Sequence, residues 1–270
     1  VGISRVCVCL PAISDVPPKF KCPLTVIGEA RLVPDPDAVY QFAIQENAGQ
    51  GQQSEVTRYI LAPGLFKNYD FALGWDYCPR NVLDKTLHML RELFQLELMV
   101  GIEHEFVLFD GDTDQPISEL TYCSNEKYHK AHKYLEELSK TLQSMGIFTE
   151  QLHAESAPGQ YELAIRHTTG MKAADHVAVF RETARMLAHK YNLRVSFSPK
   201  PFDSAAGSGS HIHLSLASLQ DGSNVLADEA GELSEMGREF IAGIMFGLPA
   251  LCAITTSSPI SYCRVGPGAW

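Results

Sequence analysis

The 270-residue sequence lacks an uninterrupted apolar run of the length that a membrane-spanning helix needs. Its longest candidate, residues 240–254, is short and contains Gly243, Gly247 and Pro249. A secretory signal pattern is also absent. From these absences we expect no membrane partner and a cytoplasmic location.

Basic residues are in the minority, with 22 Lys and Arg against 32 Asp and Glu and a formal net charge of −10. A nucleic-acid-binding surface needs cationic side chains to neutralise phosphates, so this balance argues against a nucleic-acid partner. The seven cysteines are odd in number and include no CxxC pair. We therefore expect reduced thiols rather than a disulfide framework.

The sequence has no GxxxxGK[ST] loop, so it lacks the phosphate cradle of P-loop proteins. It has instead four short blocks in which acidic, imidazole or guanidinium side chains are concentrated. These blocks are residues 101–106, 155–162, 207–216 and 261–264. Three of them place such side chains at period-two spacing, which puts residues i and i+2 on one face of a β-strand.

The shared strand faces gather charge that a sheet has no structural reason to collect. The residues that share a face are Glu103 with Glu105, Gln160 with Glu162, and His211 with His213 and Ser215. Crowded carboxylates repel one another unless a counter-charge is present. A donor set of carboxylates and imidazoles without thiolates suits Mg²⁺ or Mn²⁺ better than structural zinc. We therefore predict one metal-binding cavity, whose ligands are Glu103, Glu105, Glu155, Glu162 and His211.

Each block also has a purely structural interpretation. The glutamate pair of the first block could lie on an exposed strand face, and the turn at Pro158 and Gly159 could belong to a surface loop. A histidine such as His211 is more often a hydrogen-bonded core residue than a ligand. Arg264 could clamp a phosphate or carboxylate in bidentate fashion, but it could equally form a surface salt bridge.

Helical spacing and turn signals divide the rest of the chain. Helices are predicted from Pro79 onward and at about 124–145, 175–191 and 233–254. Strands are predicted at 6–10, 59–61, 98–109, 147–153, 160–165, 194–197 and 211–217. Hairpin-like strands alternating with long helices predict an α+β fold, with an antiparallel sheet backed by helices. The pattern changes near residue 78, so we divide the chain into domains 1–77 and 78–270.

Taken in order, the four blocks resemble the glutamine synthetase family. The family's motifs appear here as GxExEF, ExxPGQxE, GSGxHxHxSL, and SYxR followed by PGxW. The segments at 78–80 (CPR) and 199–201 (PKP) are also similar to the family. The resemblance is strong over 78–270, faint over 1–77, and points to the bacterial-type and fungal glutamine-synthetase-like branch.

The resemblance implies a partial β-grasp domain over 1–77 and a glutamine-synthetase-type catalytic domain with a curved antiparallel sheet over 78–270. It implies an ATP-dependent carbon–nitrogen ligase of glutamine biosynthesis. Glutamate or a related acid would be joined to ammonia or an amine through an acyl phosphate, with Mg²⁺ or Mn²⁺ holding the phosphates. Family members form rings, so the implied partners are these small molecules and further copies of the chain.

The family's functional positions carry over residue by residue. Those of one metal are Glu105, Glu155 and Glu162, and those of a second metal are Glu103 and His211. The nucleotide-contacting positions are Glu150, His213 and Ser215. The substrate-binding positions are Gln160, Gly207 and Arg264, and the resemblance gives catalytic roles to Arg264 and Glu162.

Two departures from the family bear on substrate and activity. Ala206 stands where the family has an asparagine that helps to bind glutamate, which leaves the choice of acid open. The family chain also continues past Trp270, with another metal-ligand glutamate and several phosphate-binding arginines, so we expect residues 1–270 to be inactive alone. A non-catalytic relative that keeps the metal site is the alternative. A zinc hydrolase is disfavoured because four carboxylates outnumber the imidazoles.

Overall fold

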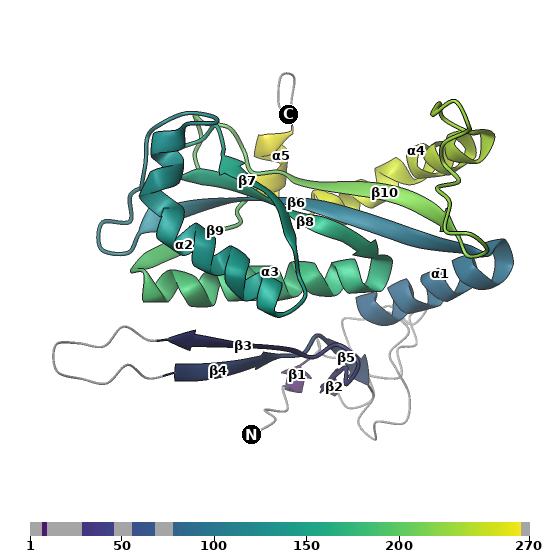
Figure 1. Cartoon of the computed structure of the whole chain (residues 1–270), viewed down its shortest axis with the longest axis horizontal. Helices are drawn as coiled ribbons and strands as arrows, with labels where there is room; N and C mark the ends of the chain where they lie inside the picture. Colours follow the sequence, from purple (N-terminus) through teal and green to yellow (C-terminus); the bar gives the residue numbers. More distant parts are fainter. Residues whose placement is uncertain (1–6, 10–28, 46–55, 68–77, 266–270) are drawn as a thin grey trace.

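The computed structural model describes residues 7–9, 29–45, 56–67 and 78–265. Its centre is an antiparallel sheet in the order β10-β6-β8-β7, with β9 pairing to the far end of β6 (Figure 1). The strands are β6 (Leu96–Asp110), β7 (Thr149–Ala154), β8 (Gln160–Thr169), β9 (Leu193–Ser196) and β10 (Ser210–Ser218). The predicted α+β fold is confirmed.

Two helices, α2 (Asn125–Ser144) and α3 (Gly170–Lys190), cover one face of this sheet (Figure 1). Alternate residues of the central strands point to that face, and Phe106, Tyr161 and Leu163 are fully buried there. The helices contribute the other side of the core through residues at helical spacing, such as Leu135 and Leu138 of α2. One sheet face is therefore used for packing, and the other is left for polar side chains.

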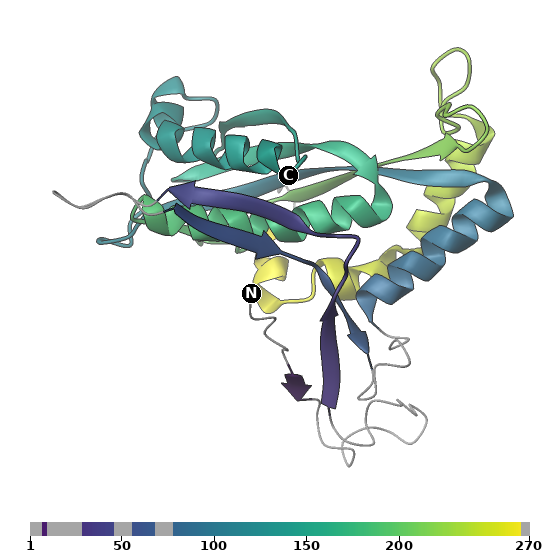
Figure 2. The same ribbon diagram turned by 60° about the horizontal axis from the view of Figure 1, so that its bottom comes forward.

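The N-terminal part adds two small antiparallel sheets. One contains β1 (Cys7–Cys9), β2 (Glu29–Pro34) and β5 (Gly64–Lys67), and the other pairs β3 (Tyr40–Gln45) with β4 (Val56–Leu61). The β3–β4 ribbon lies beside α3 (Figures 1 and 2), and its alternate residues Tyr40, Phe42 and Ile44 are buried in the same core as the main sheet. Residues 68–77, where we divide the domains, lie outside the described residues, so the division stays a prediction.

Several element bounds differ from the sequence-based predictions. Helix α3 begins at Gly170, before the predicted start, because Gly170 packs against Leu87 and Leu98, and a Cβ there would lie 3.1–3.2 Å from their methyl groups. This tertiary contact outweighs the low helix propensity of glycine. Helix α5 (Pro259–Arg264) was not predicted, and its N-cap Ser258 accepts a hydrogen bond from the backbone N–H of Ser261.

The last long helix, α4 (Glu235–Thr255), corrects the expectation drawn from its apolar run. It has 21 residues with a hydropathy of 1.4, and 6% of the apolar window is buried, so by length and composition it could cross a membrane. The helix continues through Pro249 and begins well before residue 240. Length and composition alone do not distinguish such a helix from one that packs against another protein surface.

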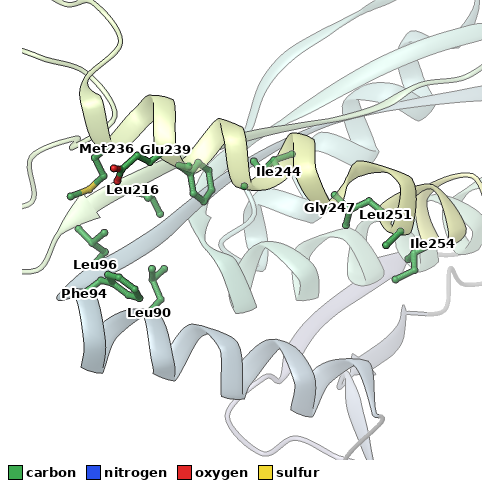
Figure 3. A pocket seen from close by; sticks show the side chains of 13 residues that line it. Leu90, Phe94, Leu96, Leu216, Met236, Glu239, Ile244, Gly247, Leu251 and Ile254 are labelled. Carbon is green, nitrogen blue, oxygen red and sulfur yellow. The ribbon is translucent and has the colours of Figure 1, made fainter.

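Helices α1 (Pro79–Phe94) and α4 line an apolar groove of about 800 Å³ (Figure 3). Leu90 and Phe94 of α1 line one end of it, on the side of Met236 of α4, and Leu251 and Ile254 line it further along α4. Most side chains on α4 are half or fully exposed, including apolar ones. An apolar helix exposed on this scale indicates a contact surface.

Candidate metal centre

Strand register brings the predicted acidic residues to one face of the sheet. His211 of β10 pairs with Glu103 of β6, and Glu105 of β6 pairs with Glu162 of β8. On the other side of β8, Glu162 pairs with His153 of β7. Directly paired residues project their side chains to the same face of a sheet. Four strands therefore contribute ionisable groups to the face opposite α2 and α3.

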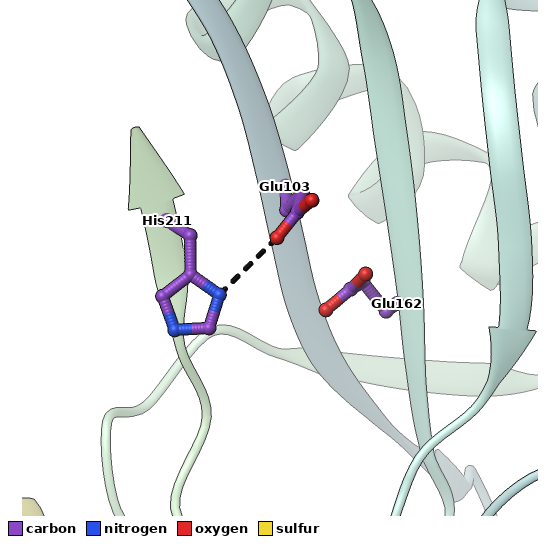
Figure 4. Close-up of side chains that lie close together, drawn as sticks. All are labelled: Glu103, Glu162 and His211. Atoms are coloured by element: carbon purple, nitrogen blue, oxygen red, sulfur yellow. Dashed lines mark hydrogen bonds and ion pairs between the residues drawn. The ribbon is translucent and has the colours of Figure 1, made fainter. Parts of the chain in front are cut away.

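The first group of potential ligands consists of Glu103, Glu162 and His211, with ligand atoms within 4.8 Å of one another (Figure 4). The carboxylate of Glu103 lies between two imidazoles. Its Oε2 is 3.2 Å from Nδ1 of His211, and its Oε1 is 3.0 Å from Nε2 of His213. Both histidines are exposed, which excludes the core interpretation of them.

The second group consists of His153, Glu155 and Glu162, also within 4.8 Å of one another. Nε2 of His153 lies 2.9 Å from Oε1 of Glu155, and Oε2 of Glu155 accepts a hydrogen bond from the N–H of Ser156. His153 was not among the predicted ligands. The signal was present, because His153 and Glu155 stand at the same i, i+2 spacing that identified Glu103 and Glu105.

Glu105 lies on the same face but belongs to neither group. Its Oε2 accepts a hydrogen bond of 2.8 Å from Nε2 of Gln160. The same Nε2 donates to the carbonyl oxygen of Gly207, and Oε1 of Gln160 accepts from the N–H of Ala157. The fully buried Gln160 therefore braces β6, the 155–160 turn and the glycine loop against one another.

Burial and charge together make this face unfavourable for ionised carboxylates. Desolvation raises the pKa of Glu162, and the neighbouring Glu103, Glu105 and Glu155 raise it further, while His153 opposes them. Desolvation and Glu155 likewise raise the pKa of Glu105. A bound divalent cation would supply the missing positive charge. The carboxylate and imidazole donors fit a hard cation such as Mg²⁺ or Mn²⁺.

The glycine loop before β10 packs closely against Arg264 of α5. A Cβ on Gly207 would lie 2.7 Å from both the Pro199 carbonyl oxygen and Cγ of Arg264. A Cβ on Gly209 would lie 2.6 Å from Oε1 of Glu105 and 3.1 Å from Nη2 of Arg264. Only glycine permits this approach, which places the guanidinium beside Glu105. Both side chains line one pocket of about 400 Å³.

The three predicted nucleotide-contacting residues do not meet at one point through any contact in the described structure. Glu150 lies at a register shift of β7 and forms an exposed ion pair with Arg166, with Nε 3.0 Å from Oε1. His213 contacts Glu103, and Ser215 follows it on β10. Their roles in nucleotide binding stay a prediction.

Residues 76–270 match the family model for the glutamine synthetase catalytic domain. The chain belongs to the glutamine synthetase family. Type-1 glutamine synthetase 1 of Dictyostelium discoideum is 35% identical over 73% of this chain and 42% of its own length. A gamma-glutamylpolyamine synthetase of Streptomyces coelicolor is 28% identical over 90% of this chain and 50% of its own length.

The fold of this glutamine synthetase family member also matches a solved structure described as a novel glutamine synthase homolog. That structure superposes with a TM-score of 0.81 at 29% identity, over 99% of this chain and 61% of that one. The chain spans about half the length of the curated relatives it matches. Membership of this family supports a ligase.

Proposed function

We propose that this chain is the catalytic domain of an ATP- and Mg²⁺- or Mn²⁺-dependent ligase that forms a γ-glutamyl amide. The acid would be glutamate or a related compound, and the second substrate would be ammonia or an amine. One observation carries the proposal: carboxylates and imidazoles from four strands converge in two groups that share Glu162. The donor chemistry of these groups fits divalent cations, and the family supplies the reaction class.

Glu103, Glu162 and His211 would hold one cation, and His153, Glu155 and Glu162 another. Glu105 lies beside both groups and is available as a further ligand. Bound divalent cations would supply charge neutralisation for the phosphates during transfer. Gln160 would orient Glu105 by donating its amide N–H to Oε2 of that carboxylate.

In the proposed reaction an oxygen of the substrate γ-carboxylate bonds to the terminal phosphorus of ATP, and ADP leaves. The nitrogen of ammonia or an amine then bonds to the acyl carbon, the phosphate leaves and a proton is released. Arg264, fixed beside Glu105 by the glycine loop, would hold a substrate carboxylate or the transferring phosphate in bidentate fashion. Gly207 would contribute to the substrate site by letting Arg264 pack closely against the loop.

The nitrogen substrate could be an organic amine as well as ammonia. One relative is named a gamma-glutamylpolyamine synthetase, which supports an organic amine as a second substrate class. Ala206 removes the polar side chain that the family uses next to the glycine loop, so a related acid is also compatible. We further propose a cytoplasmic homo-oligomer, with the exposed apolar surface of α4 as a contact between subunits.

Hydroxamate formation tests the proposal. The full-length gene product would be assayed with ATP, Mn²⁺, hydroxylamine and a panel of carboxylic acids. We expect product from at least one acid with the wild type and none with Glu162→Gln, while the control Glu229→Gln on an exposed loop keeps full activity. Metal binding without hydroxamate from any acid would favour the alternative, a non-catalytic relative that retains the metal site.

A further inference from the structure

A buried lysine holds the turn that carries Glu155. Lys127 lies in the first turn of α2 and is fully buried. Its Nζ donates hydrogen bonds to the carbonyl oxygens of Glu155 at 2.5 Å and Ala157 at 2.6 Å. Burying an ammonium group costs several kcal/mol, so a buried lysine needs hydrogen-bond acceptors for its ammonium group. Here those bonds fall on the backbone of the turn between β7 and β8.

Neighbouring groups leave Lys127 little freedom. The hydroxyl of Ser124 accepts a hydrogen bond from the backbone N–H of Lys127. The hydroxyl of Tyr161 donates a hydrogen bond of 2.7 Å to the carbonyl oxygen of Lys127. Nζ also lies 6.0 Å from the centroid of the Tyr161 ring. Next to it, the N–H of Cys123 donates to the carbonyl oxygen of Ala154. The start of α2 is thus joined to the end of β7 and the start of β8.

The hydrogen bonds within the turn do not themselves fix the carbonyl of Glu155. The N–H of Glu155 donates to the carbonyl oxygen of Gln160, and the N–H of Gln160 donates to that of Ala157. Among the bonds described for this turn, Lys127 is the partner of the Glu155 carbonyl. The orientation of this peptide plane sets the direction of the Glu155 side chain, which reaches His153 and Glu162.

We infer that Lys127 is a positioning residue for the metal centre, and that its two hydrogen bonds aim Glu155 at the group it shares with His153 and Glu162. The inference rests on the proposed function, because it takes this group to hold a divalent cation. The hydrogen bonds described for the ammonium end on backbone oxygens, so it acts through Glu155 and has no direct role in the reaction. An apolar residue could fill the same space, but it could not hold the turn.

Mn²⁺ titration tests this role, with free Mn²⁺ measured by electron paramagnetic resonance. The wild type should bind two ions, and Lys127→Met should weaken one site by about 10- to 100-fold, the range for loss of a group that orients a ligand. The other site, which does not use Glu155, should change little. The control Tyr134→Phe removes a buried hydrogen bond to the Ala184 carbonyl, away from the turn, and should bind like the wild type.

A double-mutant cycle with Glu155→Gln separates positioning from general destabilisation. Lys127→Met should add nothing to the affinity loss of Glu155→Gln, because both act on one ligand. Additive losses, or wild-type affinity at both sites in a folded Lys127→Met or Lys127→Leu variant, would overturn the inference. Failure of both Lys127 variants to fold would also count against a role specific to the turn. A wild-type chain that binds no Mn²⁺ would overturn the proposed function as well.

Discussion

Among the acidic side chains of the sheet, Glu162 belongs to both candidate metal groups and is 8% exposed. Its pKa in the folded protein lies above the ordinary value of 4.5, chiefly because of desolvation and then because of nearby glutamates. The folded state therefore binds a proton more tightly than the unfolded chain. The free energy of unfolding falls as the pH rises from 4.5 through the raised pKa.

We predict that Glu162→Gln raises the melting temperature of the metal-free protein at neutral pH, because it removes a carboxylate that is costly when ionised. The difference from wild type should vanish below pH 4.5, where both side chains are neutral. Saturating Mn²⁺ should reverse the order, since a ligand at 100 times its Kd stabilises the wild type by about 2.7 kcal/mol. Thermal melts over a range of pH, with and without Mn²⁺, measure the difference at neutral pH, its loss at low pH and its reversal by the metal. Equal Mn²⁺-induced shifts of the melting temperature in both proteins would contradict a ligand role for Glu162.

A second residue-scale prediction concerns Gly209. A methyl group there would meet the ends of three side chains, namely Oε1 of Glu105, Nη2 of Arg264 and Cε1 of His211. Such ends can move, so Gly209→Ala should change the free energy of unfolding by less than about 1 kcal/mol. The displaced Glu105 and His211 should nevertheless weaken Mn²⁺ binding by about tenfold or more.

The matched control for this variant is Gly243→Ala in α4. Nothing lies within 4 Å of a Cβ at that position, and alanine in a helix is favoured over glycine by about 0.5–1 kcal/mol. Gly243→Ala should leave Mn²⁺ affinity unchanged. Calorimetric titration of both variants decides the matter, and wild-type affinity in Gly209→Ala would show that Glu105 and His211 do not serve the metal.

Residue by residue, the period-two pattern was enough to place Glu103 and Glu105 on one face of their strand, but the register is what brings Glu162 and His211 to that same face of the sheet. The same rule would have found His153. The brace formed by Gln160 could not be predicted, because its partners come from residues 105, 157 and 207. Hydrogen bonds between segments this far apart in the sequence cannot be predicted from the spacing of neighbouring residues.

At the scale of elements, Arg80 joins three parts of the chain. Its guanidinium forms ion pairs with Asp35, after β2, and with Asp175 of α3, and all three side chains are largely buried. We predict that Arg80→Met costs about 3 kcal/mol, because it leaves two desolvated carboxylates without their cation. Denaturant unfolding measures this loss.

The control is Lys140→Met, which removes an exposed i, i+4 pair with Glu136 on α2. Exposed pairs of this kind contribute about 0.3–0.5 kcal/mol. Equal losses in the two variants would mean that the Arg80 cluster adds no more than a surface ion pair.

Element bounds were predictable where the signal is local. Ser124 caps α2 as its sequence context predicts, and α1 begins at Pro79. The prediction was wrong at the start of α3, where Gly170 is helical because it fits between Leu87 and Leu98. The sequence-based prediction also did not include α5, because a helix of six residues is too short to show a helical period.

At the scale of the whole molecule, the fold class followed from alternating strands and helices, but the strand order did not. The order β10-β6-β8-β7 places distant segments side by side, and a shift of one residue in the register of a strand would turn that strand's candidate ligands to the buried face. The shared strand faces connected the glutamate and histidine blocks, and the family resemblance connected all four blocks, but neither gave the register. The convergence of these side chains is therefore a property of tertiary structure.

The whole-molecule prediction concerns association through α4. Phe246 is 93% exposed and Ile254 is 77% exposed on this apolar helix, and Ile254 borders the groove beside α1 (Figure 3). Apolar surface of this extent favours contact with another protein surface, so we expect the purified chain to self-associate as its concentration rises. The double variant Phe246→Ser and Ile254→Ser should shift sedimentation velocity toward the monomer. Val56→Thr, at an exposed apolar residue of β4, should not. A wild type that sediments as a monomer at all concentrations, or a double variant that associates as strongly as the wild type, would show that α4 is not the contact surface.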